Sequence, residues 1–127
     1  MKTPITQVPR GPKVSGPYSP GMVAEGKFLF VSGQIPINPM TGKVERGSLE
    51  EQTELTLNNV KAVVEAGGGK IENVVSCRVY LQVLNPESFA KMNQVYSKFF
   101  GSHAPTRTTI GCNLLGFDIE IDCVVVL

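Results

Sequence analysis

An arginine and a glutamate near the C-terminal end of the chain have the types and spacing to do chemistry. Arg107 lies in a β-branched, alternating stretch at residues 105–112, and Glu120 lies in a second alternating stretch at residues 117–122. We interpret the two stretches as the strands of a hairpin with a short loop at residues 113–116.

The predicted register of this hairpin brings the side chains together. If its two strands pair directly across the loop, Thr109 lies opposite Glu120, and Arg107 lies diagonal to Glu120 on the same face. A guanidinium near a carboxylate and a hydroxyl can hold a small carboxylic acid and direct a water molecule at it. The alternative interpretation is a surface ion pair, which contributes little on a sheet.

The chemistry of each group fits the binding of a small carboxylic acid and the addition of water to it. Arg107 offers a planar fork that matches a carboxylate, and Glu120 can accept a proton from an attacking water. Asp118 and Asp122 fall on the face of Glu120, and we predict solvated surface roles for them. Which carboxylate pairs with Arg107 stays open at this point.

Composition bounds the remaining possibilities. A chain of 127 residues predicts a single domain, residues 1–127, and the net charge of +1 without a run of Lys and Arg makes nucleic-acid binding an unfavoured interpretation. There is no apolar stretch of membrane-spanning length and no signal-peptide pattern at the start. We therefore expect a cytoplasmic protein with no membrane partner, and leave a mitochondrial location open.

Cysteine and histidine usage predicts neither a metal site nor a cofactor. The three cysteines, Cys77, Cys112 and Cys123, have no CxxC spacing and are expected to be free thiols. His103 is the only histidine, so the ligands that zinc requires are missing.

The expected elements define an α+β fold. Ser48 and Glu51 form a capping box before a helix that runs to about Ala66. Asn85 and Pro86 begin a second helix, and strands are expected on both sides of each helix. The order ββαβαββ predicts a single mixed β-sheet with both helices on one face. The other, partly apolar face predicts an oligomer.

Taken together, the motifs resemble the Rid family, the reactive intermediate deaminases, whose older label is L-PSP-type endoribonuclease (YjgF-type). The resemblance covers essentially the whole chain and rests on residues 16–21 (GPYSPG), 31–36 (VSGQIP), 52–64, 105–109 (PTRTT) and 119–121 (IEI). Each motif is weak alone, but together and in this order they are specific.

The resemblance implies a homotrimer of chorismate-mutase-like subunits around a central β-barrel, with active sites between neighbours. It implies hydrolysis of enamines and imines, such as 2-aminoacrylate, 2-iminobutanoate and 2-iminopropanoate, to 2-keto acids and ammonia. By motif, Arg107 binds the substrate carboxylate and Glu120 positions the attacking water. The resemblance also implies Tyr18 as a third catalytic residue, and as substrate-binding residues of the cleft it implies Ser32, Gly33, Thr109 and Asn93.

Two departures from the family pattern bear on these expectations. The segment between Arg107 and Glu120 is two residues shorter than in well-studied members, an even change that should leave both residues on one face. Thr109 takes a position often held by cysteine, which argues against a covalent step there. Two alternatives stay open: an endoribonuclease, and a non-catalytic trimer that binds small carboxylates.

Overall fold

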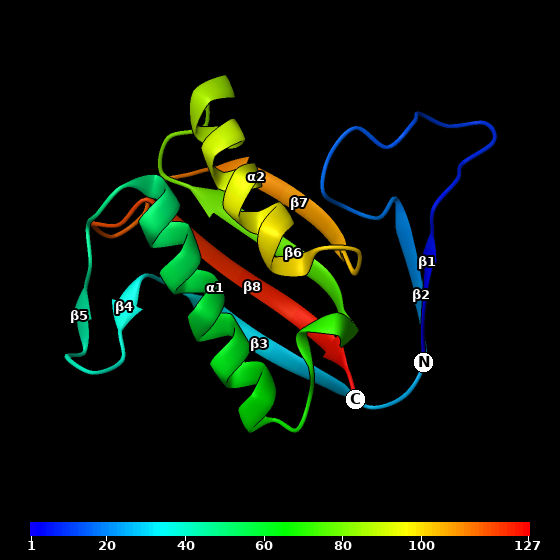
Figure 1. Cartoon of the computed structure of the whole chain (residues 1–127), viewed down its shortest axis with the longest axis horizontal. Helices are drawn as coiled ribbons and strands as arrows, with labels where there is room; N and C mark the ends of the chain where they lie inside the picture. The colour runs from blue at the N-terminus through cyan, green and yellow to red at the C-terminus, as the bar shows by residue number, and fades with distance from the viewer.

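A four-stranded mixed sheet forms the centre of the protein in a computed structural model that describes residues 1–127 (Figure 1). The strands follow the order β3-β8-β6-β7, and two helices cover one face of the sheet. These elements are β3 (Phe28–Gln34), β6 (Val74–Leu81), β7 (Thr106–Gly111), β8 (Ile119–Val126), α1 (Leu49–Ala66) and α2 (Pro86–Phe100). The predicted α+β fold, with two helices on one face of a mixed sheet, is confirmed.

Shorter elements lie outside this sheet. The chain begins with a separate antiparallel hairpin of β1 (Lys2–Ile5) and β2 (Gly21–Ala24), which projects beside the main sheet (Figure 1). A second small hairpin pairs β4 (Ile37–Asn38) with β5 (Lys43–Val44), and a 3₁₀ turn, η1 (Ile71–Asn73), precedes β6. Neither α1 nor α2 has the combination of length and apolarity that a membrane span requires.

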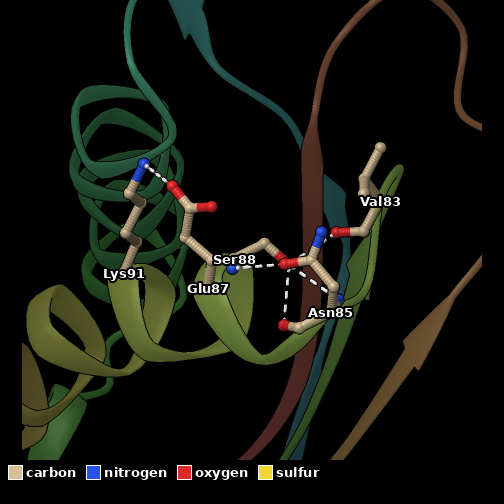
Figure 2. Close-up of polar contacts among 5 residues, drawn as sticks. All are labelled: Val83, Asn85, Glu87, Ser88 and Lys91. Carbon is tan, nitrogen blue, oxygen red and sulfur yellow. Dashed lines mark hydrogen bonds and ion pairs between the residues drawn. The ribbon is translucent and has the colours of Figure 1, made fainter.

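Both predicted helix starts are confirmed. Ser48 Oγ accepts from the backbone N–H of Glu51 at 3.1 Å, and Glu51 Oε1 accepts from the N–H of Ser48 at 2.9 Å. At α2, Asn85 and Ser88 make the same reciprocal pair at 2.8 and 3.0 Å (Figure 2). These caps satisfy amide groups that the first turn of a helix leaves without partners.

Two further contacts fix the start of α2 (Figure 2). Ser88 Oγ also donates to the carbonyl of Val83 at 2.8 Å, and Lys91 pairs with Glu87 at 2.9 Å one turn along the helix. The hydrogen bond from Ser88 connects the helix to the segment that follows β6, which includes Val83. The position of α2 over β6 and β7 is therefore set by short-range polar contacts as well as by packing.

The core lies between the helices and the sheet. Fifteen buried residues form one cluster, with contributions from α1, α2 and the three strands β3, β6 and β8. The strand side of the cluster comes from alternate residues, because side chains of a strand point to opposite faces in turn. On β6 and β8 these are Cys77, Val79, Leu81, Ile119, Ile121, Cys123 and Val125.

The predicted C-terminal hairpin is wrong. β6 lies between β7 and β8, pairing parallel with β7 and antiparallel with β8. Thr109 is therefore opposite Val79, and Glu120 is opposite Tyr80. The physical reason is the β6–α2–β7 unit, in which a crossover helix returns the chain parallel to the strand it left. The connection at residues 112–118 must then cross β6 to reach β8. Seven residues are long enough for this, because they can span roughly 23 Å and strands that flank a third strand lie ~10 Å apart.

The second face of the sheet carries no helix. Phe28 and Phe30 of β3 are 43% and 75% exposed there, and Ile110 of β7 is 44% exposed. Polar side chains of β6 and β8 lie between these apolar residues, including Tyr80 and Glu120. The expected uncovered face is present, with apolar borders and a polar middle.

Candidate functional site

Arg107 is held by one face of α2. Its Nη1 donates to Oδ1 of Asn93 at 2.6 Å, and Sδ of Met92 lies 3.8 Å from the same nitrogen. Its Cζ lies 5.3 Å from the ring centroid of Phe89 and 4.8 Å from that of Tyr96. Three turns of α2 therefore fix the guanidinium through a hydrogen bond and two aromatic faces, each a favourable contact for a cation.

The charge of Arg107 has no anionic partner within the chain. The ion pairs in the structure are Arg78–Asp122 and Lys91–Glu87. Arg107 is half-buried, and this desolvation lowers its pKa from the ordinary value. A partly desolvated guanidinium that keeps free donors is suited to bind a carboxylate in two-point contact.

Tyr18 lies near enough to Arg107 for the charge of the guanidinium to act on its hydroxyl. The loop that carries it is fixed to the start of β7, because Ser19 Oγ donates to the carbonyl of Ala104 at 2.6 Å and Ser19 N donates to that of Pro105 at 3.0 Å. The Tyr18 hydroxyl lies within 3.5 Å of Ser15 Oγ. Hydrogen bonds from Ser15 lower the pKa of Tyr18, with a smaller contribution from the charge of Arg107.

Thr109 is two residues after Arg107 in β7, so its side chain lies on the same, helix-facing side of the sheet. It pairs with Val79 of β6, a fully buried residue. Its Oγ1 is inaccessible to solvent and has no hydrogen-bond partner in the chain. The side of the sheet beneath α2 thus gathers Arg107, Asn93 and Thr109.

Glu120 belongs to a second group on the helix-free face. β3 has a bulge at this point, because Ser32 and Gly33 together stand opposite the single residue Asp122. The carboxylate of Glu120 lies directly against Gly33: a Cβ at position 33 would overlap its Oε2. The predicted cleft residues Ser32, Gly33 and Glu120 are therefore brought together, and Gly33 is required by close approach.

Sequence reasoning missed a polar network beside Glu120. Asp122 Oδ1 accepts from Nε of Arg78 at 2.8 Å, and its Oδ2 accepts from the hydroxyl of Tyr80 at 3.1 Å. Burial raises the pKa of Tyr80, and the charge of Asp122 raises it further. The alternation of Arg78 and Tyr80 with buried apolar residues in β6 was the available signal. Asp122 is only 18% exposed at its side chain, so its predicted solvated role is wrong.

The two groups lie on opposite faces of the sheet, which corrects the prediction of a shared face. Arg107 is in register with Cys77 and Cys123 on the helix side, whereas Glu120 is in register with Tyr80 on the other. The prediction assumed that β7 pairs directly with β8, whereas β6 lies between them. One chain alone does not present Arg107 and Glu120 to the same small ligand.

Two hollows of the chain lie away from both groups. One, of about 230 Å³, lies at the start of α2 between Leu49, Val83 and Asp118. Another, of about 730 Å³, lies between α1 and α2 and is lined by residues such as Glu54 and Lys98. Neither contains Arg107 or Glu120. The candidate site therefore consists of two half-sites: the helix-side half-site around Arg107 and the helix-free half-site around Glu120.

Comparison with protein families matches residues 9–127 to the family described as Endoribonuclease L-PSP. A RutC family protein of Pyrococcus abyssi is 43% identical over 113 residues, which is 89% of this chain and 87% of that protein. The Escherichia coli (strain K12) protein TdcF, whose name describes a reactive intermediate deaminase, is 39% identical over 121 residues, 93% of this chain and 91% of TdcF.

Solved structures show the same fold. The Yersinia pestis protein YyfB, described as a Rid family protein, aligns with a TM-score of 0.86 at 25% identity and covers 99% of this chain and 98% of its own. Escherichia coli TdcF, solved with bound serine, aligns with a TM-score of 0.72 at 35% identity, covering 98% of this chain and 99% of its own.

Proposed function

Because the chain belongs to the L-PSP endoribonuclease family, which includes proteins named reactive intermediate deaminases, we propose that it hydrolyses small imino acids to 2-keto acids and ammonia. The observation that carries this proposal is the half-buried guanidinium of Arg107, which has aromatic and amide neighbours but no anionic partner. Its free donors fit the carboxylate of an imino acid. A carboxylate and a nitrogen-bearing carbon are also present in the serine found in TdcF.

The chemistry requires a nucleophilic water and a base. Water adds to the carbon of the C=N bond, Glu120 accepts the proton that this water loses, and the imine nitrogen gains a proton and becomes an amino group. The resulting carbinolamine collapses when its hydroxyl loses a proton and its amino nitrogen gains one, so that the C–N bond breaks, ammonia leaves and the 2-keto acid remains. The finer proposal is that the substrates are 2-iminopropanoate, which forms from 2-aminoacrylate, and 2-iminobutanoate. The small size of these acids suits a reaction governed by positioning.

We further propose that two subunits of a homotrimer share each site. Arg107 and Glu120 lie on opposite faces within one chain, so a ligand that contacts both must lie between the helix-side half-site of one subunit and the helix-free half-site of its neighbour. The exposed Phe28, Phe30 and Ile110 on the helix-free face supply apolar surface for such contact.

The assembly is directly measurable. Light scattering at micromolar concentration is expected to give about three times the subunit mass of 13.7 kDa. A stable monomer across the same concentration range would contradict the shared site, because neither half-site is complete without a neighbour.

Asn93 is expected to keep the charge of Arg107 available. Its amide oxygen accepts one N–H of the guanidinium without neutralising it. Asn93→Asp would place a carboxylate at the same position, so 2-oxobutanoate binding measured by calorimetry should weaken by about ten-fold or more, since charge-assisted pairs are worth ~1.5–3 kcal/mol. Asn93→Asp that binds 2-oxobutanoate normally would show that the ligand carboxylate binds elsewhere.

The test of the proposed function is an imine-trapping assay. An amino-acid oxidase generates the imine, semicarbazide traps it, and the protein should lower the yield of semicarbazone by hydrolysing the imine first. The non-catalytic alternative predicts 2-keto acid binding with unchanged semicarbazone yield. The endoribonuclease alternative predicts RNA cleavage by the wild type that Arg107→Ala, prepared identically, has lost.

A further inference from the structure

From the hydrogen bonds at the start of β8, we infer that Gln52 is a positioning residue for Glu120; this inference deepens the proposed function and rests on it. Gln52 lies in the first turn of α1 and is 1% exposed. The nearest buried residues of α1, Thr53 and Thr56, are also polar, but Gln52 is the largest polar side chain buried in the protein. An amide group buried this deeply is costly unless its N–H and C=O groups have hydrogen-bond partners, and those of Gln52 have them.

The side chain of Gln52 uses both ends of its amide on one residue. Its Nε2 donates to Oδ2 of Asp118 at 2.8 Å, and its Oε1 accepts from the backbone N–H of Asp118 at 2.9 Å. The second N–H of the amide donates to the carbonyl of Gly47 at 2.9 Å. The remaining backbone group of Asp118, its carbonyl, accepts from the N–H of Gln82 at 3.0 Å.

Asp118 is thus fixed through its amide, its carbonyl and its carboxylate. This matters because the preceding residues 113–116 form no regular structure, and Leu115 in the middle of them is 92% exposed. The paired part of β8 begins at Ile119, the next residue. The connection is also held by the backbone N–H of Cys112, which donates to the carbonyl of Leu81, and by the buried ring of Phe117. Gln52 adds the contacts that fix the point at which this connection becomes a strand.

The position of Glu120 depends closely on that point. Glu120 is two residues after Asp118, and a slip of one residue would move its side chain to the helix-covered face. Smaller shifts also matter, because its carboxylate already lies against the backbone of Gly33 with no room for a methyl group between them. Gln52 acts through the strand and touches no substrate, so its effect should fall on the water-activating step.

The expected kinetic result separates positioning from general damage. Gln52→Leu should lower kcat for imine hydrolysis by about ten- to a hundred-fold, the cost of misplacing a catalytic group, while 2-oxobutanoate affinity, which depends on Arg107, stays unchanged. Val60→Ala serves as the matched control, since Val60 is fully buried two turns along α1 and contacts the core. It should lower the melting temperature without changing kcat. Equal loss of kcat and ligand affinity in Gln52→Leu would overturn the inference.

A second test exchanges the hydrogen-bond donor and acceptor between positions 52 and 118. It does not require the protein to fold with a leucine at position 52. Gln52→Glu places two carboxylates together and should lower kcat. Adding Asp118→Asn restores a donor facing an acceptor, and kcat should recover most of its loss in the double variant. Asp118→Asn alone keeps an oxygen that can accept from Gln52 and should be close to wild type. A double variant no better than Gln52→Glu would overturn the inference.

A crystal structure of Gln52→Leu decides the matter independently of the reaction. We expect Glu120 to be displaced from Gly33 and the pairing of β8 to begin later than Ile119. If Glu120 and the start of β8 stay in place, Gln52 is not a positioning residue, whatever the activity. If instead the wild type fails to hydrolyse imines, the proposed function falls, and the structural comparison still decides what Gln52 positions.

Discussion

Arg107→Lys should lose most imine hydrolysis, with kcat/KM reduced about ten- to a hundred-fold, because the loss of a charge-assisted two-point contact typically costs ~1.5–3 kcal/mol. Lysine keeps the positive charge but cannot hold a carboxylate at two points. It also loses the planar surface that faces Phe89 and Tyr96. Steady-state kinetics with an oxidase-generated imine, together with calorimetry using 2-oxobutanoate, measure this loss.

The control for Arg107→Lys is a second arginine on the same sheet. Arg78 is 65% exposed at its side chain, lies on the other face and is already paired with Asp122. Arg78→Lys retains a charge that can pair with Asp122 and should leave 2-oxobutanoate affinity close to that of the wild type. Normal binding and turnover in Arg107→Lys would remove Arg107 from its proposed role.

Glu120→Gln should lose turnover while it keeps ligand binding. The amide has the shape of the carboxylate and fits the same space beside Gly33, but it cannot accept the proton of the attacking water. The loss of a general base typically lowers kcat by ~10²–10⁴-fold, and 2-oxobutanoate affinity should change little. Asp122→Asn removes a neighbouring negative charge from the same strand and tests whether charge alone explains the effect. Lost binding with normal turnover in Glu120→Gln would reverse the proposed roles of Arg107 and Glu120.

Local signals in the sequence predicted the local structure well. The capping pairs at Ser48 and Asn85 are defined by residues three positions apart, so the helix starts could be predicted without knowledge of the rest of the chain. The motif around Gly33 predicted a backbone that another group can approach closely, and in the structure the carboxylate of Glu120 lies against it. These features depend on short-range backbone geometry.

The non-local features could not be obtained from alternation alone. The period-two pattern of β7 and β8 shows that both are strands but does not show which strand lies between them. The helix between β6 and β7 was the better guide to their parallel pairing. Gln52 was missed for a similar reason: its partner Asp118 is 66 residues away in the sequence, and a polar residue beside an apolar helix stripe is usually exposed.

Co-assembly of two inactive variants tests the central claim most directly. Arg107→Ala and Glu120→Gln are denatured together, refolded as a mixture and assayed for imine hydrolysis beside each variant refolded alone. If neighbouring subunits supply Arg107 and Glu120, a random mixture of trimers should restore about a quarter of the wild-type activity, since each mixed trimer holds one intact site. Activity in the mixture no higher than in the separate variants, while the wild type refolds to full activity, would contradict a shared imine-hydrolysing site.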